Sequence, residues 1–312
     1  MQTILITGGA GFIAGALARR LATDSSNKIV IVDNLITGDL TNLPTNENNN
    51  VIFLNADVNH ADAIRPLFEA HQFDVVFHYA ALVGVQRTLQ HPVSVLNDID
   101  GIRNILNCCV QFRVKRVFYS SSSEVYGEPV QVPQHEHTTP LNSRLPYAIV
   151  KNLGEAFLRS YHQEYQLNYT IFRFFNTYGN GQSMDFVMSK FIDLALKNED
   201  ITIYGDGSQT RTFCYIEDNL DATLSILNGG HFINDVVNIG SDDEMTILEL
   251  AQRIINKTQS KSRIVHLPPL AEGDMTRRRP DISKMKMVMK RPLTTMDKGI
   301  EELIKSKGSC VA

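Results

Sequence analysis

Short apolar runs and longer amphipathic stretches follow one another through the first half of the chain. The apolar runs are rich in β-branched residues and contain few polar ones, which is typical of strands buried on both faces of a parallel sheet. We expect strands at residues 3–7, 29–33, 51–54, 75–80, 116–120 and 169–175. We expect helices near residues 12–23, 60–71, 92–112 and 146–166. This alternation predicts an α/β fold with a doubly wound parallel sheet of the Rossmann type.

The pattern changes after about residue 176. "DFVMSKFIDLALKN" and "TILELAQRIINKT" have helical spacing, "ITIYGDGSQTRTFCYI" indicates two short strands around a DG turn, and a last helix is expected at 296–306. We therefore divide the chain into a Rossmann domain at 1–176 and a smaller mixed α/β domain at 177–312, with the chain crossing back at about 211–240. In such folds ligands bind at the carboxyl edge of the sheet, which we expect the smaller domain to cover.

Composition removes several classes of function. The 312 residues carry a net charge of −4 and show no basic stripe, so nucleic acid is not an expected partner. The four cysteines form no CxxC pair, and we expect no metal site. The chain enters a strand-like run at "MQTILITGG" without a basic leader or an apolar run long enough for a membrane, so we expect a cytoplasmic protein.

A glycine-rich turn follows the first expected strand and opens the first helix. "ITGGAGFIAG" at 6–15 places Gly8 and Gly11 where the backbone can turn tightly and approach a pyrophosphate at a helix N-terminus. Asp33 ends the second strand, where a carboxylate accepts hydrogen bonds from an adenosine ribose and repels a 2′-phosphate. Asp57 ends the third strand, where it is either an adenine ligand or a strand terminator. The order of strand, turn and helix supports a dinucleotide-binding motif, and the carboxylate of Asp33 predicts NAD rather than NADP.

The stretch "LPYAIVKN" places Tyr147 and Lys151 four residues apart, just after Pro146 at an expected helix start. Side chains at this spacing share one face of a helix, and an ammonium beside a phenol favours the phenolate. A surface pair is the alternative interpretation. A tyrosine base near pH 7 needs its pKa lowered by roughly 3 units, and the cationic nicotinamide of NAD⁺ can supply what one lysine does not.

The ordered set of motifs resembles the extended short-chain dehydrogenase/reductase family, and within it the nucleotide-sugar epimerases, dehydratases and decarboxylases. The resemblance rests on the glycine-rich opening and Tyr-x-x-x-Lys together with "HYAA", "FYSSSSEVYG", "RFFNTYG", "GDGSQTRTFCYIEDNLDA" and "RRRPDISK". It covers nearly the whole chain. One departure is Ala14, where the family usually has a third glycine; alanine is the smallest replacement, and we expect cofactor binding to survive.

The resemblance implies roles for individual residues. Tyr147 is the base, Lys151 orients the ribose and lowers the tyrosine pKa, and Ser122 bonds the reacting oxygen. The resemblance places cofactor contacts at Gly8, Gly11, Phe12, Ile13, Asp33, Asn34, Asp57, Val58, Ala80, Ala81, Asn97, Tyr147 and Lys151. Substrate contacts are implied at Val83, Ser122, Tyr147, Asn176, Arg211 and Arg278. Surface ion pairing is the alternative for Arg211, and a solvated basic turn is the alternative for Arg278.

The reaction implied by the resemblance is oxidation of a sugar hydroxyl, normally at C4, of a UDP- or other nucleotide-linked sugar. Dehydratases of the family carry Thr-Asp-Glu where this chain has Ser122, Ser123 and Glu124, so 4,6-dehydration is disfavoured. The triplet and the RxPDI-type element resemble UDP-glucuronate decarboxylases. Against this, "SMDF" at 183–186 lacks the Gly-Arg of those enzymes, and "AALVGVQRTLQHP" at 80–92 resembles the 4-epimerase loop. We expect a decarboxylase, with a 4-epimerase as the alternative.

Two further expectations concern class and assembly. A non-catalytic NAD-binding sensor is the alternative from a different class, and the intact Ser122, Tyr147 and Lys151 set argues against it. Members of the family commonly dimerise through two helices per subunit, which here are 92–112 and 146–166. We therefore expect a homodimer that takes a nucleotide sugar as substrate, with polysaccharide biosynthesis as the setting that the resemblance implies.

Overall fold

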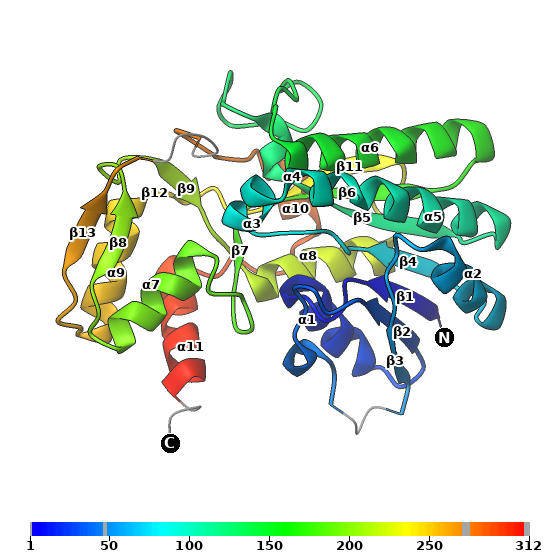
Figure 1. The fold of residues 1–312 in the computed structure, drawn as a ribbon, viewed down its shortest axis with the longest axis horizontal. Coiled ribbons are helices and arrows are strands. Elements are labelled where there is room, and N and C mark those ends of the chain that lie inside the picture. Colours follow the sequence, from blue (N-terminus) through cyan, green and yellow to red (C-terminus); the bar gives the residue numbers. More distant parts are fainter. Residues whose placement is uncertain (1, 46–48, 270–274, 309–312) are drawn as a thin grey trace. The chain divides into compact units, whose positions relative to one another are not determined.

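A computed structural model describes residues 2–45, 49–269 and 275–308 of the chain (Figure 1). Its largest element is a seven-stranded sheet in the order β11-β6-β5-β4-β1-β2-β3. The strands are β1 (Thr3–Thr7), β2 (Lys28–Asp33), β3 (Val51–Asn55), β4 (Val75–His78), β5 (Arg116–Ser122), β6 (Tyr169–Phe174) and β11 (Asp235–Ile239). β1 pairs in parallel with β2 and β4, β2 with β3, and β4 with β5. The predicted doubly wound parallel sheet is confirmed.

Helices connect the parallel strands and cover the sheet. They are α1 (Phe12–Ala22), α2 (Ala61–Ala70), α3 (Val85–Gln90), α4 (Pro92–Leu96), α5 (Asp98–Gln111) and α6 (Pro146–Tyr165). The single helix expected at 92–112 is wrong in detail, because Asn97 separates α4 from α5. α5 and α6 run side by side along the sheet (Figure 1).

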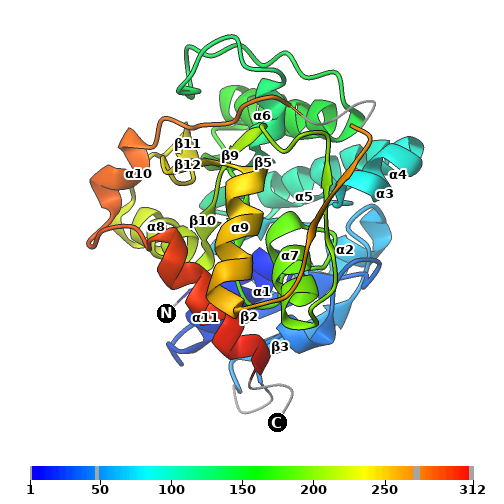
Figure 2. The ribbon, with the colours of Figure 1, turned by 90° about the vertical axis from the view of Figure 1, so that its left-hand side faces the viewer.

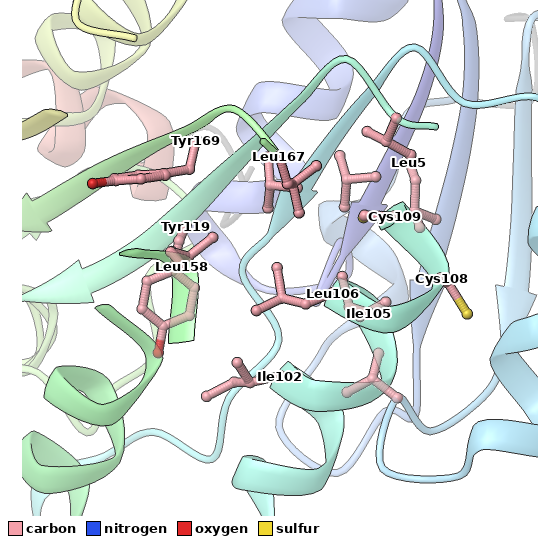
Figure 3. Close-up of a cluster of buried hydrophobic side chains, with 14 of the residues drawn as sticks. Leu5, Ile102, Ile105, Leu106, Cys108, Cys109, Tyr119, Leu158, Leu167 and Tyr169 are labelled. Atoms are coloured by element: carbon pink, nitrogen blue, oxygen red, sulfur yellow. The ribbon is translucent and has the colours of Figure 1, made fainter. Parts of the chain in front are cut away.

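One hydrophobic cluster joins α2, α5 and α6 to a single face of the sheet. Figure 3 shows part of it, where Ile105 and Leu106 of α5 gather beside Leu5 of β1. Tyr119 of β5 and Leu158 of α6 lie at the other end of the same cluster. All five side chains are almost completely buried. This packing fixes α6, which carries the predicted base, against β5, which carries the predicted serines.

The chain divides into two compact units, which we describe separately. The first comprises residues 1–125, 143–173 and 226–237, and the second comprises residues 126–142, 174–225 and 238–312. The first unit therefore contains most of the seven-stranded sheet and recruits a late segment that includes the start of β11. None of the described helices is both long and apolar enough to cross a membrane.

The second unit is built from small sheets and helices. Its strands are β7 (Thr177–Tyr178), β8 (Ile201–Tyr204), β9 (Thr210–Thr212), β10 (Cys214–Tyr215), β12 (Glu244–Thr246) and β13 (Ile264–Leu267). The helices are α7 (Val187–Leu196), α9 (Ile247–Thr258), α10 (Ser283–Val288) and α11 (Met296–Gly308), and α8 (Ile216–Gly229) begins here and ends in the first unit. Figure 2 shows α7 and α11 on either side of α9, and a separate cluster of buried apolar side chains joins the three helices.

Candidate functional site

The predicted tyrosine and lysine lie on the first two turns of α6, as their spacing requires. Pro146 occupies the start of the helix, where its missing N–H has no intrahelical partner to lose. Tyr147 is half-buried, whereas Lys151 is 3% exposed. The Lys151 Nζ donates to the Ser120 carbonyl at 2.6 Å and to the Ser120 Oγ at 3.2 Å. The ammonium is thus fixed by the end of β5.

Two aromatic rings surround this ammonium. Its Nζ lies 5.7 Å from the centroid of the Tyr147 ring and 5.1 Å from that of Tyr119. Burial lowers the pKa of Lys151 from 10.5 to about 8, and the carboxylate of Asp98 opposes that shift. A partly desolvated cation beside a phenol stabilises the phenolate more strongly than an exposed lysine does, because water screens the exposed one. The arrangement suits Tyr147 to accept a proton.

The serines at the end of β5 supply the neighbouring polar groups. Ser122 is half-buried, and its Oγ accepts a hydrogen bond from the backbone N–H of Glu124 at 3.2 Å. Ser123 is 2% exposed, and Glu124 is half-buried on the short 3-10 helix that follows β5 (Ser123–Tyr126). Ser122, Tyr147 and Lys151 therefore belong to one strand–helix pair of the first unit.

The glycine-rich turn has the geometry expected of a phosphate-binding loop. Gly8 has φ +70°, and a Cβ there would lie 2.7 Å from the backbone of Ala80, so only glycine fits. Gly11 is the N-cap of α1. Within the described parts of the chain, no side chain caps the backbone N–H groups of the first turn of this helix. Phe12 and Ile13 form the first turn of that helix and are half-buried. An anion can take the open N–H groups.

Asp33 stands at the end of β2 beside this turn. Its carboxylate accepts the backbone N–H of Ala10 at 3.0 Å and that of Leu35 at 2.8 Å. Asp57 has a comparable place after β3, where it accepts from the Asn34 Nδ2 at 2.9 Å and from the backbone N–H of Asn59 at 2.8 Å. The structure thus brings Asp33, Asn34 and Asp57 to one edge of the sheet, and Val58 beside them is buried.

The loop after β4 carries Ala80, Ala81 and Val83, which are half-buried. The backbone N–H of Ala80 donates to the Oγ1 of Thr7 at 3.2 Å, which ties the loop to β1. Asn97 has an exposed side chain, whereas its neighbour Asp98 accepts the backbone N–H of Leu82 at 2.7 Å. Burial raises the pKa of Asp98, and the Leu82 hydrogen bond and the charge of Lys151 oppose that rise.

The predicted substrate residues Asn176, Arg211 and Arg278 belong to the second unit and lie around one short strand. The Asn176 Nδ2 donates to the Thr212 carbonyl at 2.9 Å. The Arg278 backbone N–H donates to the carbonyl of Thr210 at 3.3 Å, and Thr210 is the residue before Arg211 in the chain. Arg211 is 8% exposed and Arg278 is 5% exposed. Two buried guanidinium groups on adjacent segments suit a phosphate-bearing ligand.

These residues fit the predicted cofactor. The open N-terminus of α1 would hold the diphosphate of NAD, Asp33 would face the adenosine ribose, and Asp57 would face the adenine. Within the described ranges no cluster of three or more His, Cys, Asp or Glu side chains could hold a metal ion.

Two polar residues of the first unit were not predicted from the sequence alone. Ser120 accepts hydrogen bonds from Lys151, and Asp98 holds the loop at Leu82. The run of serines and the acidic residue at the start of a helix are the signals that point to them. Neither signal distinguishes a buried partner from a solvated turn or a helix N-terminus.

Comparison with known proteins identifies the family of the chain. Residues 4–240 match the model of the "NAD dependent epimerase/dehydratase family". The UDP-N-acetyl-alpha-D-glucosaminuronate decarboxylase of Bacillus cytotoxicus is 35% identical, with 96% of each chain covered. UDP-glucuronic acid decarboxylase 1 of Danio rerio is 34% identical over 97% of this chain and 72% of that protein. The UDP-glucose 4-epimerase of Thermotoga maritima, solved with UDP-glucose, has a TM-score of 0.93 at 28% identity, covering 99% of this chain and all of that one.

Proposed function

The chain belongs to the NAD dependent epimerase/dehydratase family, and we propose that it transiently oxidises the C4 hydroxyl of a nucleotide-linked sugar. The observation that carries the proposal is the Tyr147–Lys151 pair, with Lys151 buried and held by Ser120 beside the strand end that bears Ser122. Tyr147 accepts the proton of the hydroxyl, and Ser122 holds the oxygen from which the proton leaves. NAD, when bound, supplies the acceptor for the hydride and returns it at the end of the cycle.

The specific reaction that we propose is decarboxylation of a UDP-linked glucuronate. Oxidation at C4 makes a β-keto acid, whose C5–C6 bond breaks with loss of CO₂ and leaves an enolate that takes a proton at C5. Ser123 is 2% exposed and has no useful acidity, so the aspartic acid that dehydration requires is missing from this position. The decarboxylases of Bacillus cytotoxicus and Danio rerio support the proposal.

Epimerisation at C4 is the second candidate. The segment 183–186 carries no arginine that could face a sugar carboxylate, and the Thermotoga maritima enzyme of closely similar fold is a 4-epimerase. In that reaction the hydride returns to the opposite face of the 4-keto sugar, and no carbon–carbon bond breaks.

The nucleotide end of the substrate is assigned to the second unit. Arg211 follows Thr210 in the chain, and the backbone N–H of Arg278 donates to the Thr210 carbonyl. Both arginines are buried, and a guanidinium is a planar donor fork that suits a diphosphate. Asn176 holds the Thr212 carbonyl and has φ +34°, so its own backbone is fixed in an uncommon conformation.

The assay that separates the candidates mixes the protein with NAD⁺ and UDP-glucuronate and follows the anomeric proton by NMR. A pentose signal supports decarboxylation, and a galacturonate signal supports epimerisation. Silence with this sugar moves the measurement to a panel of nucleotide sugars, and silence across the panel contradicts the proposal. Glu124→Gln sharpens the result, because decarboxylation should fall while epimerisation largely survives.

Tyr147→Phe tests the base itself. The variant keeps the ring that packs beside Lys151 and loses only the hydroxyl. We expect reduction of bound NAD⁺ by the sugar, followed at 340 nm, to fall by about 10²-fold or more. Full turnover by this variant would remove Tyr147 from the mechanism.

We further propose that two copies of the chain pair through α4 and α6, which pack against each other. The exposed apolar side chains of this face are Val93 and Leu96 on α4 and Ile149 and Leu153 on α6. Their spacing places each pair on one face of its helix, as in an interface between helices. Light scattering at micromolar concentration should give a dimer mass, and Ile149→Glu with Leu153→Glu should give a monomer.

A further inference from the structure

A buried carboxylate lies one helical turn beyond the catalytic lysine. Glu155 of α6 is 0% exposed and accepts hydrogen bonds from three side chains. Its Oε1 accepts from the Ser121 Oγ at 2.7 Å and from the Arg173 Nε at 2.8 Å. Its Oε2 accepts from the Arg173 Nη2 at 2.7 Å and from the Arg159 Nη2 at 2.8 Å. The carboxylate is thus fully occupied in the described structure.

The charge state of this group follows from its partners. Burial alone raises the pKa of Glu155, but the hydrogen bonds and charge of Arg173, aided by Ser121 and Arg159, hold it below the ordinary value. Arg173 is itself 1% exposed and meets the carboxylate through two parallel bonds. The pair is therefore an ionised, bidentate contact with one preferred geometry.

These contacts join three elements at the end of β5. Arg173 comes from β6, the neighbour of β5 in the sheet, and Ser121 comes from β5 itself. Ser120, one residue earlier, is held by Lys151, and Ser122, one residue later, carries the hydroxyl assigned to the reacting oxygen. Lys151 and Glu155 lie four residues apart on one face of α6, so consecutive residues of β5 are tied to consecutive turns of the same helix.

We propose that Glu155, held by Arg173, is a positioning residue of the reaction, acting through Ser121. It fixes the last residues of β5 against α6, so that the Ser122 hydroxyl and the Ser120 carbonyl keep their places relative to Tyr147 and Lys151. The inference rests on the proposed function, because it assigns a task to residues whose catalytic role is proposed above.

Stability alone is a poor explanation for this pair. A buried ion pair commonly contributes no more than apolar side chains of similar volume would, because both charges lose their hydration. The interface between α6 and β5 is otherwise very close: a Cβ at Gly154 would lie 2.2 Å from the Tyr119 Oη. Because the two elements pack this closely, a small shift of the end of β5 changes which atoms Lys151 can reach. Catalytic groups must be held to within about 0.5 Å of their productive positions.

Ser121→Ala is the first variant to test, because it removes the link to β5 and leaves the Glu155–Arg173 pair intact. In the NAD-saturated full-length protein we expect kcat to fall by about tenfold or more, with KM for NAD⁺ and for the sugar changed by less than about twofold. We also expect backbone amides of residues 120–124 to exchange with deuterium about tenfold faster, followed by peptide mass spectrometry.

A second variant separates positioning from folding. Glu155→Met with Arg173→Met removes both buried charges at similar volume, so the melting temperature should stay close to that of the unaltered protein. If the pair serves only stability, kcat of this double variant should match that of the unaltered protein, and the proposal is overturned. If the pair positions the strand end, kcat stays low in a protein that folds well. Glu69→Gln, at an exposed pair with Arg65, is the control and should change neither rate nor exchange.

The outcomes distinguish this inference from the proposed function. Absence of NAD⁺ reduction by every nucleotide sugar in the unaltered protein would refute the proposed function, and the deuterium exchange of residues 120–124 would still decide whether Ser121 anchors the strand end. Unchanged exchange in Ser121→Ala overturns the anchor whatever the activity. Faster exchange together with an unchanged kcat overturns its role in the reaction.

Discussion

The two groups of proposed site residues are held in different ways. At the end of β5 in the first unit, the contacts of Lys151 with Ser120 and of Glu155 with Arg173 are almost completely buried. In the second unit, the segment that carries Arg278 is held by its neighbours through partly exposed groups. Arg277 pairs with Glu244 at 2.6 Å, with side chains 47% and 17% exposed, and Thr276 bonds Glu128 at the surface.

The difference has a physical meaning. Buried charges are screened little by water or salt and hold one geometry, while exposed pairs contribute little and weaken with ionic strength. A rigid arrangement suits a proton transfer, because misplacement of a base by a fraction of an ångström lowers its rate. A less rigid arrangement suits the segment around Arg278, to which we assign the nucleotide. The following predictions test this contrast, beginning with the largest effect.

The largest effect is expected at Lys151. Lys151→Met keeps the volume of the side chain but removes the charge beside Tyr147 and the bond to Ser120. We expect kcat to fall by about 10²–10⁴-fold, as for loss of a group that supports general base catalysis. The rate of NAD⁺ reduction by the sugar measures it. Lys197→Met, at an exposed pair with Asp193, is the matched control, and an equal loss there would contradict the assignment.

The second prediction concerns stability and pH. Because burial lowers the pKa of Lys151 from 10.5 to about 8, the unfolded chain holds a proton between these values that the folded chain has released. The contribution of Lys151 to stability should therefore rise with pH across this window, by up to about 3 kcal/mol. Other groups titrate in the same window, because burial raises the pKa of the Cys109 thiol and of the Tyr119 hydroxyl above their ordinary values, so the contribution of Lys151 is measured as a difference.

Urea unfolding of the unaltered protein and of Lys151→Met, at pH values on both sides of the window, measures this contribution as a difference. The free energy of unfolding of the unaltered protein should rise with pH relative to that of the variant. If both proteins change equally with pH, Lys151 does not titrate in this range.

The third prediction moves to the second unit. Arg278→Met removes a buried guanidinium assigned to the diphosphate, and we expect kcat/KM for the sugar to fall by about 10–100-fold, mainly through KM. Binding of NAD⁺ should be unchanged in calorimetry. Arg263→Met, at an exposed pair with Asp200, should behave as the unaltered protein. An equal loss of NAD⁺ affinity in Arg278→Met would place this arginine in a structural role.

The smallest effect is expected at the exposed pair. Arg277→Gln should change the free energy of unfolding by less than about 1 kcal/mol and raise KM for the sugar only a few-fold. Both differences should disappear in about 1 M salt, where charges at the surface are screened. A large loss that persists in high salt would show that the segment around Arg278 is held as firmly as the end of β5.

Much of the first unit could be predicted from the sequence. Uninterrupted β-branched runs gave six strands of the sheet within a few residues, and five of these are buried along almost their whole length. The expectation of burial on both faces is wrong for β3, which lies at the edge of the sheet and is partly exposed. The seventh strand, β11, is a short run that pairs with β6 although about sixty residues separate them, and local pattern carries no information on such pairing. The break at Asn97 was missed because α4 and α5 together have the length and composition of one helix.

The site was predictable where spacing defines the chemistry and not where burial does. Tyr147 and Lys151 are four residues apart, and their neighbourhood followed from the helix alone. Glu155 and Arg173 have the appearance of solvated charges in the sequence, because a charged residue on an amphipathic helix or at a strand end is usually exposed. Asp98 was not predicted for a similar reason, since the sequence does not show that its carboxylate is partly buried and accepts the N–H of Leu82.

The carboxylate of Asp33 has a consequence for how readily this protein could change its coenzyme. Both of its oxygens are already engaged, one with the backbone of Ala10 in the glycine turn and one with that of Leu35. Gly38 packs so closely that a Cβ there would lie 2.7 Å from the Asp33 Oδ1. An engineer who replaces Asp33 to admit a 2′-phosphate therefore also loosens the glycine-rich turn to which we assign the diphosphate. Conversion to NADP would require coordinated substitutions in the turn and in the loop at Gly38.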